Sequence, residues 1–175
     1  FTIAKDVKFQ LEFNPAKVKE YRLIGYENRL LNEEDFEDDK KDAGEMGAGH
    51  TVTALYEIVP ATKDREDSKL KYQSTNLTEE AINSNDLITL KLRYKEPDGF
   101  KSKLLTKTVS TDLVSFGNTS DNFRFSAAIA EFGMLLRDSE FKGSTTFESA
   151  VKLAKNAKGE DEEGYRGEFI RLIKS

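Results

Sequence analysis

The amino-acid sequence predicts an α+β fold, in which an antiparallel β-sandwich or a strongly bent sheet is followed by a C-terminal bundle of about three helices. Over roughly residues 5–112, several segments alternate apolar and polar residues, which is typical of strands with one buried face. After Gly117 the apolar residues take up helical spacing, over roughly residues 121–174. Because strands and helices are segregated along the chain, a parallel sheet of βαβ units is disfavoured. We expect a β-rich part at 1–116 and a helical part at 117–175 packed on it.

Three strands are predicted in the first 60 residues. The first has Val7, Phe9, Leu11 and Phe13 on one face and polar side chains on the other, and Asn14-Pro15 ends it. The second runs from about residue 18 to 28, and the third spans 51–59. Residues 32–50 and 60–86 form long polar connections between strands.

A hairpin follows at residues 88–110. Apolar residues alternate over 88–94, and the return strand is 103–110. The sequence Glu96-Pro97-Asp98-Gly99 predicts the turn between them, because proline fixes φ and glycine accepts a positive φ.

The helical part begins with a segment at 122–137 that is apolar on most of its faces, so we expect it to be largely buried. Thr145 and Glu148 resemble a capping box that opens a second helix. Gly159 stands where a glycine often terminates a helix. Asp161 is a candidate cap for the last helix.

Composition narrows the classes of partner. The net charge is −5, from 27 Lys and Arg against 32 Asp and Glu, and the basic residues form no coherent stretch. Nucleic acid is therefore not an expected partner. No apolar run reaches the roughly 18 residues that a transmembrane helix needs. The chain lacks cysteine, which excludes disulfides, thiolate metal sites and cysteine nucleophiles. It opens without Met on a strand pattern, which indicates a piece of a longer protein.

Two motifs within or next to the connection at 32–50 resemble a nucleotide-binding and a calcium-binding loop. We interpret both as loops that bind no ligand. The stretch from Gly44 to Thr51 has P-loop spacing, but His50 replaces the essential lysine and a strand pattern follows instead of a helix. Eight carboxylates at 33–45 lack the glycine and the final glutamate of an EF-hand loop. We predict no ordered divalent metal there, and no cofactor site. These carboxylates are Glu33, Glu34, Asp35, Glu37, Asp38, Asp39, Asp42 and Glu45.

Catalytic signatures are weak. His50 is the single histidine, so a catalytic zinc site lacks its usual ligands, and no G-x-S-x-G motif presents a serine nucleophile. We expect no enzymatic activity. A hydrolase that uses carboxylates among the many available remains an alternative.

The segment at 21–29 alternates aromatic, basic and acidic side chains, and it is the candidate partner-binding surface. Its residues are Tyr21, Arg22, Tyr26, Glu27 and Arg29. Arginine stacked on tyrosine, with Glu27 bonded to Arg22 or Arg29, forms a rigid polar surface. The same residues can equally hold one strand against its neighbour.

Long segments of the chain resemble a known family. They lie at 4–15, 21–29, 42–57 and 132–139, and 164–173 is similar to the family's ending. Together they resemble the C-terminal domain of bacterial YfbK-type proteins, in which a von Willebrand factor A domain lies just upstream. The resemblance implies an exported or envelope-associated parent protein. It carries no metal site to this chain, which lacks the Asp-x-Ser-x-Ser motif of the A domain.

The resemblance implies an accessory domain that supports the upstream A domain and engages an unknown protein partner. An alternative is carbohydrate binding by the sandwich, with Tyr21, Tyr26 and Tyr56 as stacking platforms. We also expect that sequence preceding the A domain contributes a strand to this sandwich. In the isolated piece one sheet edge would then be unpaired.

Overall fold

A computed structural model describes residues 1–25, 30–61 and 77–175. It contains six strands in two antiparallel sheets and four α-helices, with the longer helices at the C-terminal end, which confirms the predicted α+β class. The chain forms two compact units. One holds most of residues 1–112, and the other holds 113–175 with the short stretches 23–25 and 53–55.

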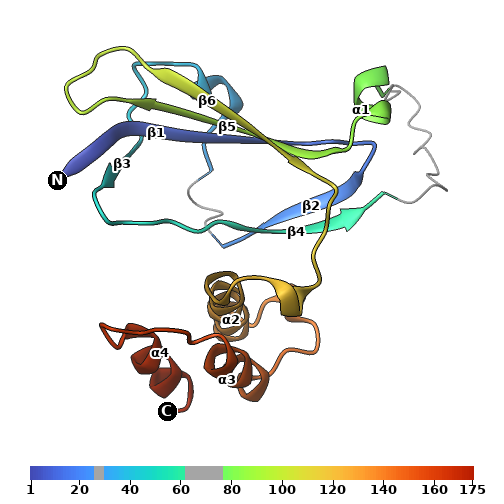
Figure 1. Cartoon of the computed structure of the whole chain (residues 1–175), viewed down its shortest axis with the longest axis vertical. Helices are drawn as coiled ribbons and strands as arrows, with labels where there is room; N and C mark the ends of the chain where they lie inside the picture. The colour runs from blue at the N-terminus through green and yellow to red at the C-terminus, as the bar shows by residue number, and fades with distance from the viewer. Residues whose placement is uncertain (26–29, 62–76) are drawn as a thin grey trace. The chain divides into compact units, whose positions relative to one another are not determined.

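The larger sheet has four strands in the order β3-β1-β5-β6 (Figure 1). Its strands are β1 (Thr2–Phe13), β3 (Gly44–Gly47), β5 (Asp86–Lys95) and β6 (Lys103–Ser110). The smaller sheet pairs β2 (Val18–Ile24) with β4 (Leu55–Pro60). Single helical turns lie at η2 (Glu33–Phe36), α1 (Glu79–Asn83), η3 (Phe116–Asn118) and η4 (Glu140–Lys142).

The burial of strand β1 differs from the expected single buried apolar face. Lys8, on the predicted polar face, is 3% exposed, whereas Phe9 is 52% exposed. The strand lies inside the sheet between β3 and β5, and a bulge between Lys5 and Lys8 places Asp6 at φ 52°. The polar face is buried because the segment after Leu31 lies over it and accepts hydrogen bonds from Lys8.

The second and third strands are shorter than predicted. Strand β2 ends at Ile24, before Gly25 with its left-handed φ of 75°. The predicted continuation through 26–28 lies outside the described residues. Strand β4 begins at Leu55, so residues 51–54 lead into it without pairing.

The predicted hairpin is confirmed. Strands β5 and β6 pair antiparallel, with Leu92 opposite Leu105 and Tyr94 opposite Lys103. The amide of Gly99 donates a 2.9 Å hydrogen bond to the carbonyl of Glu96, which closes the turn.

The unit that holds most of residues 1–112 is called the β unit below, and the other is called the helical unit. The core of the β unit lies where the two sheets meet. Phe13, Val18 and Leu87 are buried together, and Tyr56 and Ile58 from β4 pack against them. The Tyr56 ring lies 5.5 Å from the Phe13 ring, measured between centroids.

Three longer helices form the second unit, namely α2 (Asp121–Leu136), α3 (Phe147–Asn156) and α4 (Tyr165–Ile173). Ala128 on α2 and Ala150 and Ala154 on α3 are fully buried. Residues this small let helix backbones approach closely. Phe125 and Ile170 complete this core, and the Phe125 and Phe169 rings meet edge to face at 5.5 Å.

Two helix caps can be compared with the sequence prediction. The capping box of α3 is formed by Thr146 and Ser149, one residue later than the predicted pair Thr145 and Glu148. Asp161 caps α4 as predicted, although Gly164 is the boundary residue. Its carboxylate accepts hydrogen bonds from the amides of Arg166 at 3.0 Å and Gly167 at 2.8 Å.

Within the described part of the chain, no helix is both long and apolar enough to cross a membrane.

Candidate functional site

One face of the β1–β5–β6 sheet is apolar and partly open to solvent. Residues directly opposite one another on antiparallel strands share a face, and Phe9 lies opposite Leu92, which lies opposite Leu105. Phe9 is 52% exposed and Leu105 is 53% exposed. Val109, two pairs farther along the same face of β6, is also exposed. We call Phe9, Leu92, Leu105 and Val109 the open sheet face.

Strand β6 is also the edge of this sheet. Among the described residues it pairs with β5 on one side and with no strand on the other. All of its residues except Ser110 are exposed. Lys103 and Lys107 lie on the same face as Leu105, and Lys103 pairs with Glu96 at 2.6 Å. Such an edge presents free N–H and C=O groups to another strand.

Of the candidate surface predicted at 21–29, the structure describes Tyr21 and Arg22, whereas Tyr26, Glu27 and Arg29 lie outside the described residues. The Tyr21 ring stacks on Phe13 at 4.2 Å between centroids and remains 61% exposed. Arg22 pairs with Glu57 of β4, with its Nη2 2.5 Å from a carboxylate oxygen. This pair joins β2 to β4, the strand-locking role that the sequence left open.

Tyr56 does not form an exposed stacking platform. Its ring packs beside Phe13 in the sandwich core, and burial raises the pKa of its hydroxyl. Of the three predicted carbohydrate platforms, Tyr21 alone is described and exposed.

The acidic segment at 32–42 is held on the sheet by cations. The Lys8 ammonium donates to the carbonyls of Asp35 and Asp38, and Lys95 donates to the carbonyl of Asp39 at 2.7 Å. Phe36 is 5% exposed, and the guanidinium of Arg93 lies 5.4 Å from its ring centre. The described residues contain no group of three or more metal-ligating side chains. The contact between Lys8 and the acidic segment was not predicted, because the alternating pattern of β1 places Lys8 on the face expected to meet solvent.

The glycine-rich stretch at 44–51 forms strand β3 and a turn. His50 is exposed, and its Nδ1 lies 3.1 Å from the carbonyl oxygen of Ala48. Residues 51–54, which follow it, form no helix, and the N-terminus of a helix is what a P-loop requires.

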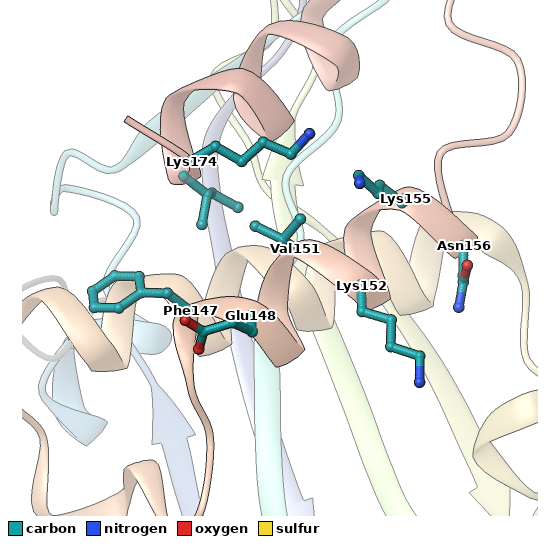
Figure 2. Close-up of a pocket in the computed structure, with 8 residues that line it drawn as sticks. Phe147, Glu148, Val151, Lys152, Lys155, Asn156 and Lys174 are labelled. Carbon is teal, nitrogen blue, oxygen red and sulfur yellow. The ribbon is translucent and has the colours of Figure 1, made fainter.

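A groove lies between α3 and the end of α4, with a volume of about 620 Å³ (Figure 2). Its apolar residues are Phe147, Val151 and Ile173. Its remaining residues are Glu148, Lys152, Lys155, Asn156 and Lys174. This groove could not be predicted from the sequence, because Lys155 and Lys174 are 19 positions apart and come together only when the two helices pack.

Comparison with known proteins identifies the family. The family model described as "Uncharacterized protein YfbK, C-terminal" matches residues 1–175. The chain belongs to the YfbK C-terminal family. The predicted resemblance to this family is therefore confirmed.

A relative shows how the YfbK C-terminal domain fits into a longer protein. The chain is 43% identical over 172 residues to "Uncharacterized protein YfbK" of Escherichia coli strain K12. That match covers 98% of this chain and 29% of the relative, so the chain corresponds to a C-terminal part of a larger protein. No solved structure matches it.

Proposed function

We propose that this YfbK C-terminal domain is a non-catalytic interaction module, whose open sheet face and β6 edge pack against another part of the longer protein. The observation that carries the proposal is the row from Phe9 through Leu92 to Leu105, which exposes large apolar side chains beside an unpaired edge. Contiguous exposed apolar surface of this kind marks an interaction site. An unpaired edge adds main-chain hydrogen bonds to the same contact.

The covering element is a strand from the remainder of the longer protein. The relative is more than three times as long as the matched segment, so ample polypeptide exists to supply it. Lys103 and Lys107 oppose the pairing of two β6 edges, because antiparallel pairing around Leu105 places lysine opposite lysine. A strand with acidic residues opposite these lysines fits better.

The place of the domain in the cell is part of the same proposal. Through its resemblance to the YfbK type, the domain would follow a von Willebrand factor A domain in an exported protein. It would support that domain in protein binding or adhesion outside the cytoplasm.

Substitution of Leu105 in two contexts tests the proposal. In the isolated chain Leu105→Asp should change stability little, because the side chain is 53% exposed. In the longer protein the same change should lower the unfolding free energy of this domain by about 2 kcal/mol or more, because the charge is then buried. Thr106→Asp, on the opposite face of β6, is the matched control. An equally small effect of Leu105→Asp in both proteins would argue against a packed face.

Carbohydrate binding is a second candidate, favoured by Tyr21. Its ring is held parallel to Phe13 and is 61% exposed, an arrangement that suits stacking on a sugar. A glycan array separates the two candidates. Binding that Tyr21→Ala abolishes would support carbohydrate recognition, and a blank array with the folded domain would reject it.

A further inference from the structure

The groove between α3 and α4 carries positive charge that is not neutralised. Lys155 and Lys174 extend toward one another from the two helices (Figure 2). Lys155 lowers the pKa of Lys174, because two neighbouring ammonium groups disfavour one another. In the described part of the chain, neither these lysines nor Lys152 forms an ion pair with a carboxylate. An incoming anion would relieve this repulsion.

The same unit carries the complementary surface on the loop between α3 and α4. Glu160, Glu162 and Glu163 are exposed and have no cationic partner among the described residues. Asp161, between them, is engaged as the cap of α4. Tyr165 follows directly and is 71% exposed. We call residues 160–165 the acidic loop.

We propose that the acidic loop of a second copy of this chain docks in the groove, with Glu162 and Glu163 facing Lys155 and Lys174. Tyr165 of that copy would contact the apolar residues Phe147, Val151 and Ile173. A two-fold arrangement forms this contact twice, since each copy offers both a groove and a loop.

Another acidic stretch of the chain suits the groove less well. The segment at 32–42 surrounds Phe36 with carboxylates, but Phe36 is 5% exposed and lies under Arg93. It therefore has no free apolar side chain to place in the groove. Tyr165 does, which favours the acidic loop. This inference is independent of the open sheet face, because it concerns the helical unit alone.

Sedimentation equilibrium of the 175-residue chain at low salt tests the proposal. We expect concentration-dependent dimers that weaken as salt is added, because contacts between exposed charges are screened. Reversal of the groove charges in K155E/K174E should weaken dimerisation roughly tenfold or more. E162K/E163K should do the same. Dimerisation of these variants at the wild-type level, or a wild-type chain that stays monomeric into the millimolar range, would overturn the proposal.

A mixture of the two reversed variants gives the sharpest result. In the mixed dimer an acidic groove meets a basic loop and a basic groove meets an acidic loop, so both contacts are restored. We expect the mixture to dimerise although neither variant does so alone. The control variant is K40E/K101E. It carries the same charge change as K155E/K174E, but at exposed lysines outside the helical unit. If K40E/K101E dimerises with itself less well than the wild type, or if the reversed mixture stays monomeric, the proposed contact is wrong.

Discussion

The ammonium group of Lys8, on a residue of β1 that is only 3% exposed, donates a 3.1 Å hydrogen bond to the main-chain carbonyl of Asp35. A second bond, 2.5 Å long, reaches the carbonyl of Asp38. The acidic segment is therefore held to the sheet through its backbone, while several of its carboxylates point to solvent. A buried lysine needs such partners, because an unpaired buried charge is costly.

Replacement of this lysine should release the acidic segment. Lys8→Met keeps the length and apolar stem of the side chain but leaves two carbonyls without a donor. We expect a loss of about 1–3 kcal/mol in the free energy of unfolding. Hydrogen exchange should become faster at residues 33–42. Lys107→Met, at an exposed position of β6, is the control. Unchanged exchange over 33–42 in Lys8→Met would contradict the role of Lys8.

Acid should weaken the β unit through Asp6. The Lys95 ammonium lies 2.7 Å from the Asp6 carboxylate, and this hydrogen bond lowers the pKa of Asp6 below its ordinary 3.8. A group with a lowered folded pKa stabilises the protein above its unfolded pKa and loses this contribution as the pH falls through the folded value. Melting temperature should therefore decline below about pH 4, and Asp6→Asn should make that decline shallower.

Alkaline pH should also weaken the β unit, through Lys95, the partner of Asp6. The hydrogen bond to Asp6 raises the pKa of Lys95 above 10.5. Its stabilisation is complete below 10.5 and disappears as the pH rises through the higher folded value. Equal pH dependence in the wild type and in Asp6→Asn, at both ends of the range, would show that the pair does not contribute.

The helical unit should tolerate little extra volume at Ala154. The side chain is fully buried in the core shared by α2, α3 and α4. Ala154→Leu should cost about 1–3 kcal/mol of unfolding free energy, because the helices must move apart to admit it. Lys152→Leu, at an exposed position of the same helix, should cost much less in the same denaturant titration. Similar losses in the two variants would mean that α3 is not closely packed at Ala154.

The acidic segment should not bind a divalent metal tightly. Three of its carbonyl oxygens, at Asp35, Asp38 and Asp39, already accept hydrogen bonds from Lys8 and Lys95. Calcium requires six to eight oxygen ligands around one point. Calorimetric titration with Ca²⁺ should show no binding at sub-millimolar concentrations. Heat from a sub-millimolar site that substitutions within 33–45 abolish would refute this prediction.

Local signals in the sequence predicted much of the fold. The alternation over 88–94 and the turn residues at 96–99 are enough to predict the hairpin, because its strands and turn are close together in the sequence. The apolar spacing after residue 120 suffices for α2. The cap at Asp161 also follows from residues close in sequence.

The remaining features depend on contacts between distant residues. Lys8 has the alternation of a solvent-facing residue, and only the return of the chain at 35–38 explains its burial. The open sheet face likewise depends on three strands meeting in one register, which no single strand reveals. The partner of Arg22 in the candidate surface at 21–29 could not be predicted either, because Glu57 lies 35 positions away on another strand.

Hydrogen exchange at the β6 edge tests the central claim most directly. In an edge strand every second amide points away from its neighbour and exchanges with solvent. In the isolated chain we expect the outward amides of 103–110 to exchange fast and those bonded to β5 to exchange slowly. In the longer protein both sets should exchange slowly, because another strand pairs with the edge. Outward amides of β6 that exchange equally fast in both proteins would contradict the proposal that this edge is an interaction surface within the longer protein.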